Sequence, residues 1–410
     1  MNGIIIERKE RIPVSDACEV LVAGGGIAGI AAAAAAARNG KDVLLVEREY
    51  ALGGMATLGL VTIYLPLCDG EGRQLSYGIS EELLRLSVKH GAEANEPRAW
   101  TENGSQDDRV KNRYMTQFNP HLFALEAEAL LVSLGVRILY GTLIAAVEKS
   151  GNRIEYVVIE NKSGRGAVRA ESVIDCTGDA DVCVRAGAET ALRKGGNGLA
   201  GWYYFFDGET VRLKMFGLAD VPPENDEISE DGGVEAAQTE SLDPSIRFSG
   251  VDGSELSAAV LSVHEKMAAD ILSYREKNAA FVPVTMSSIP LVRMSRRLVG
   301  AYALDESECR VPMKDSIGMT GDWRKRGPAF EIPFGCLYGA DVPNLLTAGR
   351  CISVTDAMWD VTRVIPPCAV TGEAAGTAVS IASDFTKTDI ERLQAKLIAQ
   401  NQKIHLTDLP

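Results

Sequence analysis

The sequence predicts an α/β fold whose main domain carries a parallel sheet, and three observations predict it. A buried strand, a glycine turn, a long helix and a second buried strand follow one another near the N-terminus, as in a β-α-β unit. Glycine occurs 40 times in 410 residues, above the usual share of roughly 7%, so tight turns and close backbone contacts should recur. The length indicates about two or three structural units with a large buried core.

The β-α-β unit is defined residue by residue. Residues 18–23 form an apolar run with β-branched side chains, and the three glycines at 24–26 interrupt it. Residues 27–38 are strong helix formers, and Gly40 stops that helix. Residues 42–47 then form a second apolar strand, which suits a buried parallel sheet.

The remaining chain continues the mixture of helices and strands, divided by clusters of Gly, Pro, Asn and Ser. The helices expected there cover residues 80–90, 120–134, 254–276 and 372–382. The strands expected there cover residues 136–140, 143–147, 154–159, 168–175, 202–206 and 345–347, with further strands between 282 and 304. Ser80 and Asn119 are the expected N-caps of the first two helices, and residues 93–112 should be polar and exposed.

The acidic balance limits the classes of partner. Lys and Arg number 42 and Asp and Glu 56, for a net charge of −14, which argues against binding to nucleic acid or to anionic membranes. Residues 219–240 contain eight acids and no base, so we interpret them as a solvated loop. The uncharged run at 20–37 is rich in glycine and alanine, and we interpret it as strand, turn and helix, without membrane insertion or a secretion signal.

Cysteine usage points away from metal sites. Zinc sites and iron–sulfur clusters typically use Cys-x-x-Cys pairs. The eight cysteines of this chain contain no such pair. Eight cysteines are also too few for a disulfide scaffold in a chain of this length. We therefore predict no metal, and a reducing, cytoplasmic compartment is expected.

A dinucleotide-binding motif follows the first strand. Gly24 allows the tight turn, Gly26 lets a pyrophosphate approach the backbone, and Gly29 lets the helix pack on the strand. The first-turn amides of that helix would face the phosphates. Glu47 ends the next strand, where its carboxylate suits the ribose hydroxyls of FAD or NAD and repels the extra phosphate of NADP.

The same glycine spacing recurs at 196–201, but its context is wrong for a second nucleotide site. Charged residues Arg193 and Lys194 precede it where a strand is needed, and the aromatic run 202–206 follows it where a helix is needed. We interpret it as a loop. A single dinucleotide site and no redox cysteine pair argue against a pyridine-nucleotide reductase of the disulfide class.

Further motifs decide between FAD and NAD. They are Gly-Gly-Met-Ala-Thr at 53–57, Asp-Cys-Thr-Gly-Asp-Ala-Asp at 175–181, Asn-Leu-Leu-Thr-Ala-Gly-Arg-Cys-Ile-Ser at 344–353 and Thr-Gly-Glu-Ala-Ala-Gly at 371–376. Together they resemble the FAD-dependent oxidoreductases of the glutathione-reductase-type fold, in the branch related to fumarate reductase and succinate dehydrogenase flavoproteins. More narrowly, they are similar to the bacterial family simply called FAD-dependent oxidoreductases. The resemblance covers residues 15–60, 115–190 and 285–382.

The resemblance implies non-covalent FAD on a Rossmann-like domain with an inserted β-rich α+β cap. The implied domains are an FAD-binding part at 1–189 with a loop-and-helix insertion at 60–115, a cap at 190–325, and a C-terminal FAD-binding part with its tail at 326–410. A helix opening near Gly372 would direct its positive end at the flavin. The implied cofactor-binding residues are Gly24, Gly26, Ile27, Ala28, Gly29, Glu47, Arg48, Gly53, Gly54, Met55, Ala56, Thr57, Ile144, Thr177, Gly178, Asp179, Gly349, Arg350, Gly372 and Ala375.

Arginine is the best candidate for substrate chemistry. A strand at 293–297 would place Arg296 on the opposite face from its neighbours, and the related family tends to keep arginine there. The alternative is that Arg296 pairs with a surface acid such as Asp305 or Glu306. Arg363 precedes the expected flavin-facing helix and is the second candidate. The four histidines are interpreted as structural.

The resulting hypothesis is hydride transfer between a small organic substrate, which could carry a carboxylate, and the flavin. Arg296 and Arg363 would be the catalytic contacts, because cations stabilise developing negative charge. Two alternatives stay open at this point: an electron-transfer flavoprotein subunit with a separate redox partner, and a flavin monooxygenase. The electron donor or acceptor is unidentified, and a homo-oligomer is left open.

Overall fold

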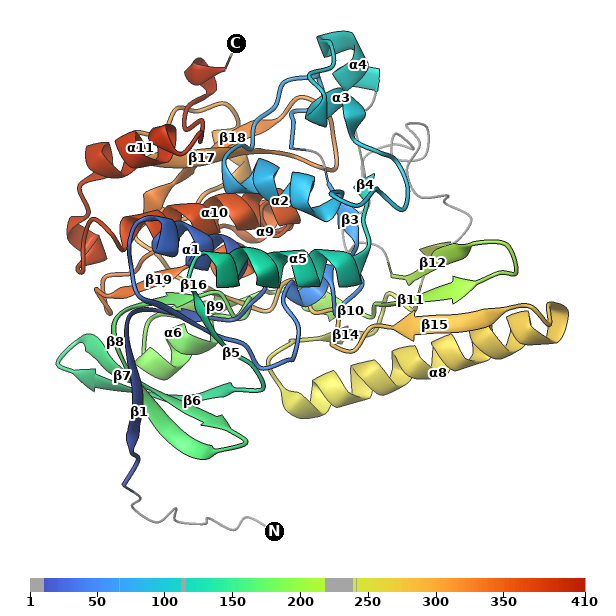
Figure 1. The fold of residues 1–410 in the computed structure, drawn as a ribbon, viewed down its shortest axis with the longest axis horizontal. Helices are drawn as coiled ribbons and strands as arrows, with labels where there is room; N and C mark the ends of the chain where they lie inside the picture. The colour runs from blue at the N-terminus through green and yellow to red at the C-terminus, as the bar shows by residue number, and fades with distance from the viewer. Residues whose placement is uncertain (1–10, 66, 112–115, 218–238, 241, 410) are drawn as a thin grey trace.

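The structure is a computed structural model that describes residues 11–65, 67–111, 116–217, 239–240 and 242–409 (Figure 1). Most of the acidic stretch at 219–240, for which a solvated loop is predicted, lies outside the described residues. Among the described residues, no helix is both long and apolar enough to cross a membrane.

A seven-stranded sheet forms the centre of the molecule and confirms the α/β prediction. Its strand order is β5-β2-β1-β8-β7-β6, and β19 pairs with β8 off this path. The pairs among β5, β2, β1, β8 and β19 are parallel, whereas β6, β7 and β8 pair antiparallel. The strands are β1 (Val14–Ala23), β2 (Val43–Val46), β5 (Arg137–Leu139), β6 (Leu143–Ser150), β7 (Arg153–Asn161), β8 (Gly164–Asp175) and β19 (Leu345–Thr347). Of the strands predicted between 136 and 175, the first (β5) pairs parallel with β2, so the antiparallel succession comprises only β6, β7 and β8.

Alternate residues of the central strands enter two separate cores. Val20, Val22 and Leu45 pack against the helices on one face of the sheet, whereas Leu21 and Leu44 pack with β7 and β8 on the other face. This period of two is what a pleated strand buried on both faces requires. The helices that cover the first face are α1 (Ile27–Arg38), α5 (Pro120–Ser133) and α10 (Ile365–Ala378), which Figure 1 shows side by side.

Helices α1 and α10 touch backbone to backbone. A Cβ added at Gly372 would lie 2.3 Å from the carbonyl oxygen of Ala28, and one added at Gly376 would lie 2.2 Å from that of Ala32. The glycines are thus required for the helix contact, and the alanine-rich composition of both helices serves the same close approach.

The prediction that a helix opens near Gly372 is wrong. Helix α10 begins at Ile365, two turns earlier, with Val364 as an extended N-cap residue. Pro366 and Pro367 occupy the first turn, where the missing amide hydrogens are not needed by the helix. The prolines, and not the glycines, mark the start of this helix.

A smaller unit is built from β11 (Gly201–Phe206), β12 (Val211–Phe216), β13 (Thr239–Glu240) and β15 (Val282–Met286), in the order β13-β12-β11-β15. The long helix α8 (Gly253–Lys277) packs on it through Val263 and Met267, beside Tyr203 and Phe205. The Asp252 side chain caps α8 by accepting hydrogen bonds from the backbone amides of Ser254 and Glu255. Figure 1 shows α8 and β15 extending away from the main sheet.

The other described helices and strands complete the fold. They are α2 (Ile79–Ser87), α3 (Arg98–Thr101), α4 (Gln106–Lys111), α6 (Asp181–Ala186), α9 (Asp356–Thr362), α11 (Ile390–Ala399), β3 (Ile63–Tyr64), β4 (Thr116–Gln117), β9 (Thr190–Leu192), β10 (Asn197–Gly198), β14 (Arg247–Phe248), β16 (Arg296–Leu298), β17 (Ser316–Gly321) and β18 (Ala329–Pro333). Asn119 caps α5 as predicted. Ser80 does not cap α2: the N-cap is Gly78, and the Ser80 hydroxyl is buried without a hydrogen-bond partner. Residues 93–112 include α3, whose Trp100 is buried, so this stretch is not wholly exposed.

Candidate functional site

A cavity of about 400 Å³ gathers most of the predicted site residues from distant parts of the chain. Five of the predicted residues do not line it: Gly29, Thr57, Arg296, Gly372 and Ala375. The predicted residues that line it are Gly24, Gly26, Ile27, Ala28, Glu47, Arg48, Gly53, Gly54, Met55, Ala56, Ile144, Thr177, Gly178, Asp179, Gly349, Arg350 and Arg363.

The glycines of the first motif have different physical roles. Gly24 has φ +99°, and a Cβ there would meet the Cys176 carbonyl oxygen at 2.7 Å. A Cβ on Gly29 would lie 1.9 Å from the carbonyl oxygen of Gly24, so Gly29 serves the packing of α1 on the first strand. Within the described part of the chain, a Cβ on Gly26 would meet no atom within 4 Å, although Gly26 lines the cavity. Gly26 therefore preserves room for a ligand and not for protein packing.

The amides at the start of α1 are oriented toward the same cavity. The first intrahelical hydrogen bond runs from the Ile30 amide to the Gly26 carbonyl, so the amides of Ile27 and Ala28 precede the helical ladder. Such first-turn amides, together with the helix dipole, favour an anion. The cavity lining here consists mainly of backbone.

Glu47 is buried at the end of β2, with only 7% of its surface exposed. One carboxylate oxygen accepts a hydrogen bond from the Gly25 amide at 2.6 Å, and the other accepts one from the Glu49 amide at 2.8 Å. Burial raises the pKa of this carboxyl, while the two amides oppose that rise. Arg48 beside it is exposed and lies 3.4 Å from Glu49.

Asp175 organises the loop that follows β8, and the sequence prediction missed it. One carboxylate oxygen accepts hydrogen bonds from the amide and hydroxyl of Thr177, at 3.1 and 2.7 Å. The other accepts from the amides of Val182 and Cys183, at 2.9 and 3.0 Å. The signal was available: an acid ending a buried strand, shortly before a helix, is placed to satisfy that helix's first amides.

Arg350 is held inside the protein. Its Nη1 atom donates to the Val292 carbonyl at 2.5 Å and lies 3.7 Å from Asp179. Ser295 donates a hydrogen bond to the same Asp179 carboxylate. A Cβ on Gly178 would lie 2.2 Å from the Arg350 guanidinium, so Gly178 admits this side chain. The cluster fastens residues 292–295 to the loop after β8.

Arg296, predicted as a catalytic contact, is not among the residues that line the cavity. No strand is present at 293–295, and β16 begins only at Arg296. The Arg296 guanidinium donates to the Asp179 carbonyl at 2.9 Å and to the Asp181 carboxylate at 2.6 Å. Its partners are therefore neither Asp305 nor Glu306 but Asp179 and Asp181, which themselves line the cavity.

Arg363 does line the cavity, and its orientation is fixed. Its Nε and Nη2 atoms lie 2.6 and 2.5 Å from one carboxylate oxygen of Asp360. The guanidinium carbon lies 5.8 Å from the centre of the Trp323 ring, whose indole nitrogen donates to the Asp360 carbonyl at 2.9 Å. Neither Asp360 nor Trp323 was predicted as a site residue. Trp323 lies far from Arg363 in the sequence, so no sequence pattern indicates their contact.

Sequence reasoning missed a group of apolar lining residues, besides polar ones such as Glu49, Thr142, Asp181 and Arg185. The apolar side chains come from the loop and strand around β3, from the start of α8, and from the segment before β16. They are Val61, Ile63, Leu65, Leu256, Ile289, Pro290 and Val292. No recognisable motif surrounds these apolar residues in the sequence. Hydrophobic periodicity predicts helices and strands, so it could not predict that these residues meet at one site.

Cys176 and Cys368 also line the cavity. Burial raises the pKa of the Cys368 thiol to about 12 and that of the Cys176 thiol well above its usual value. Both thiols are therefore neutral near pH 7, which weakens them as nucleophiles.

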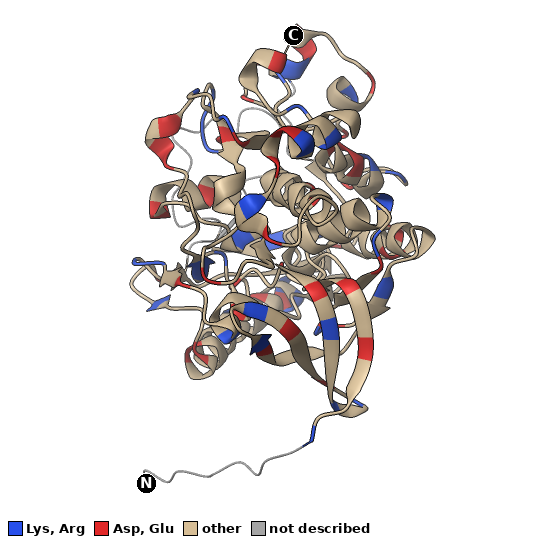
Figure 2. Cartoon of the chain, turned by 90° about the vertical axis from the view of Figure 1, so that its left-hand side faces the viewer, with Lys and Arg blue, Asp and Glu red and all other residues tan. Residues whose placement is uncertain are grey.

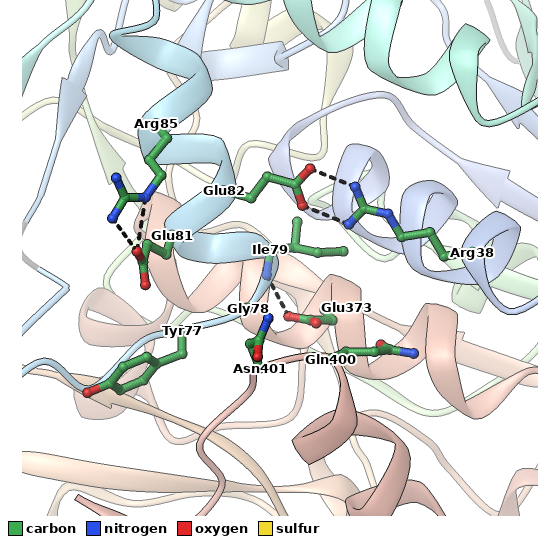
Figure 3. A pocket seen from close by; sticks show the side chains of 10 residues that line it. All are labelled: Arg38, Tyr77, Gly78, Ile79, Glu81, Glu82, Arg85, Glu373, Gln400 and Asn401. Atoms are coloured by element: carbon green, nitrogen blue, oxygen red, sulfur yellow. Dashed lines mark hydrogen bonds and ion pairs between the residues drawn. The ribbon is translucent and has the colours of Figure 1, made fainter. Parts of the chain in front are cut away.

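A second cavity, of about 590 Å³, holds none of the predicted site residues (Figure 3). Figure 3 shows Arg38 and Glu82 facing each other, joined at 2.7 and 2.6 Å. Glu373 accepts a hydrogen bond from the Ile79 amide at 2.9 Å and one from Gln402 at 3.0 Å. Burial raises the pKa of Glu373 to about 8. This carboxyl thus joins α10 to the start of α2.

The charge on the surface is mixed over the face drawn in Figure 2. Lys and Arg are interspersed with Asp and Glu among the elements of this face that the structure describes. The expectation that the protein does not bind nucleic acid rests on the net charge given above.

Comparison with known families and proteins gives one extensive match. The family model described as FAD dependent oxidoreductase matches residues 19–242 and 251–400. A curated relative, the thioredoxin reductase of Ureaplasma parvum serovar 3, is 36% identical over 70 residues, which are 17% of this chain and 23% of that protein. The chain thus spans less than a quarter of the length of this relative.

Solved structures with a similar fold are more distant in sequence. A geranylgeranyl bacteriochlorophyll reductase-like protein from Thermoplasma acidophilum is 15% identical, with a TM-score of 0.43 over 94% of this chain and 84% of that chain. The p-nitrophenol 4-monooxygenase of Pseudomonas putida DLL-E4 is 12% identical, with a TM-score of 0.46 over 93% of this chain and 80% of that chain.

Proposed function

The chain belongs to the FAD dependent oxidoreductase family, and from that premise we propose that it transfers a hydride between a small organic substrate and the flavin of FAD. The observation that carries the proposal is the cavity that joins a phosphate-binding backbone to an apolar chamber. We assign residues 190–325 to a cap over that chamber.

The residues around the cavity fit FAD. Gly26 leaves space that no protein atom fills, and the first-turn amides of α1 suit a pyrophosphate. Glu47 and Arg48 would contact the adenosine half, together with Ile144. Gly53 to Ala56 would lie along the pyrophosphate and flavin edge, and Gly349 and Arg350 along the ribityl chain.

The bound flavin supplies a ring that accepts or donates a hydride. The start of α10 would contribute a positive helix end, which stabilises negative charge. Because Pro366 and Pro367 carry no amide hydrogen, the Ile365 amide is the main donor of that first turn. Arg363 would contact the substrate, and the apolar side chains would exclude water from the reacting groups.

The test is direct. The purified protein should carry FAD that denaturation releases, and an anaerobic substrate screen should find a compound that bleaches the visible absorbance of the oxidised flavin. A protein that is colourless and takes up no FAD would overturn the proposal.

The same preparation separates the two alternatives. Substrate-dependent oxygen consumption with insertion of oxygen into the product would identify a monooxygenase. Reduction only by a co-purified redox protein, with no small-molecule reductant, would identify an electron-transfer subunit.

A further inference from the structure

The charges around Arg363 are balanced within the protein. Arg363 pairs with Asp360, and Arg324 pairs with Asp322 through two contacts of 2.9 Å each. Arg324 also lies 3.9 Å from the second oxygen of Asp360, which has no hydrogen-bond partner. Two guanidinium groups therefore face two carboxylates, and the cluster has no net charge.

One edge of the Arg363 guanidinium is not used by the protein. Its contacts with Asp360 involve Nε and Nη2, and within the described part of the chain no hydrogen-bond partner is present for Nη1. Asp360 and the Trp323 ring hold the guanidinium in one orientation. The position of Nη1 is therefore set before any ligand binds. The site therefore offers a hydrogen-bond donor, but no uncompensated positive charge.

The apolar end of the cavity offers no second charged partner. The other cations in the lining are Arg48, Arg185 and Arg350. Arg350 is used by the Val292 carbonyl, Arg185 lies 3.6 Å from Asp181, and Arg48 adjoins Glu49. An anionic group at the apolar end would thus be desolvated against a neutral cluster, which is costly.

We infer that the apolar end of the cavity takes an uncharged, largely apolar molecule, and that Arg363 Nη1 donates a hydrogen bond to its single carbonyl oxygen. This inference rests on the proposed function and narrows its substrate class: it excludes dicarboxylates and other strongly charged substrates. A buried hydrogen bond from a charged donor gives the site its selectivity, because an analogue without the oxygen leaves the donor unpaired.

Three probes of similar size test the inference on the FAD-loaded protein: acetophenone, benzoate and ethylbenzene. Binding is measured by perturbation of the visible flavin spectrum, without turnover. Acetophenone should bind at least tenfold more tightly than either of the other two, which follows from the usual strength of a hydrogen bond to a charged group. Benzoate binding more tightly than acetophenone, or no binding by any probe, would overturn the inference.

The Arg363→Met variant locates the donor. It should weaken acetophenone binding at least tenfold and leave ethylbenzene binding within about twofold. Arg165→Met, at a half-buried arginine that is paired with Glu160 and does not line the cavity, is the matched control and should change neither affinity. Unchanged acetophenone binding in Arg363→Met would refute the role of Arg363.

The outcomes remain separable from failure of the proposed function. Loss of FAD from the parent protein would overturn the proposed function itself, before any probe is added. If Arg363→Met alone fails to hold FAD, the rank order of the three probes on the parent protein still decides the substrate class.

Discussion

The two ends of the cavity differ in the residues that line them. At the Glu47 end the glycine turns and the first turn of α1 contribute to the lining, beside side chains such as Arg48 and Ile144. At the Arg363 end it consists of side chains from separate elements, fixed by contacts such as Asp360 and Trp323. Backbone sites depend on local geometry, whereas side-chain sites depend on tertiary packing. The first kind suits a cofactor common to a family, and the second kind suits a substrate that differs between relatives.

The most severe way to break the backbone end is to add a single methyl group at Gly29. A Cβ there would lie 1.9 Å from the Gly24 carbonyl oxygen, so α1 and the first turn must separate. Gly29→Ala should lower the free energy of unfolding by roughly 3 kcal/mol or more. Urea unfolding of the FAD-free protein measures it. Gly253→Ala, at a helix start where a Cβ meets nothing within 4 Å, should change stability by less than about 1 kcal/mol; equal stability of the two variants would contradict the argument.

A second substitution at the same end separates FAD binding from folding. Gly26 has φ −69° and open space around its missing Cβ, so Gly26→Val should fold normally and place its side chain in the cavity. We expect FAD affinity to fall at least a hundredfold, a loss of roughly 3 kcal/mol, measured by fluorescence titration of the FAD-free protein. The melting temperature without FAD should stay close to that of the parent. Normal FAD binding by this variant would show that the cofactor lies elsewhere.

The difference between the two ends also explains what the sequence could predict. Gly24, Gly26 and Glu47 follow one another along one β-α-β unit, so their spacing alone brings them together. The contact between Arg363 and Trp323 joins positions forty residues apart and has no periodic signal. Asp360 is close to Arg363 in sequence, but its role depends on the helical turn of α9.

The misplaced start of α10 has the same origin. Gly372 and Ala375 have the small-residue character of a helix start at a ligand, and the resemblance implied a helix start directed at the flavin. In the structure the small size of Gly372 serves the contact with α1, and α10 begins at Ile365. Small residues at a ligand and small residues at a helix crossing look alike in sequence, because both allow close approach of a backbone.

Glu373 tests whether the second cavity is independent of the first. Its pKa is about 8 in the folded protein, against 4.5 when unfolded. Between these values the folded state binds the extra proton, so this group makes stability fall as pH rises from about 4.5 to 8. Arg38 and Glu82 are the charged groups that face it.

Glu373→Gln should therefore remove that part of the pH dependence and stabilise the protein at pH 9 by roughly 4 kcal/mol. Urea unfolding at pH 5 and at pH 9 measures the difference, with the exposed Glu276→Gln as control. FAD affinity should change less than twofold. A variant no more stable than the parent at pH 9 would contradict the burial of an ionisable carboxyl here.

The smallest expected effect distinguishes two arginines that the sequence treats alike. Arg296 is held by the Asp179 carbonyl and the Asp181 carboxylate, and it does not line the cavity. Because it is part-buried and paired, Arg296→Met should cost about 1 kcal/mol of stability, measured by urea unfolding. FAD affinity and acetophenone binding should stay within about twofold of the parent, in contrast to Arg363→Met. Burial already raises the pKa of Asp181, so loss of its partner should raise that pKa further, and the stability cost should shrink at acidic pH. A large loss of acetophenone binding in Arg296→Met, with the fold retained, would return Arg296 to the substrate site and remove the distinction between the two ends.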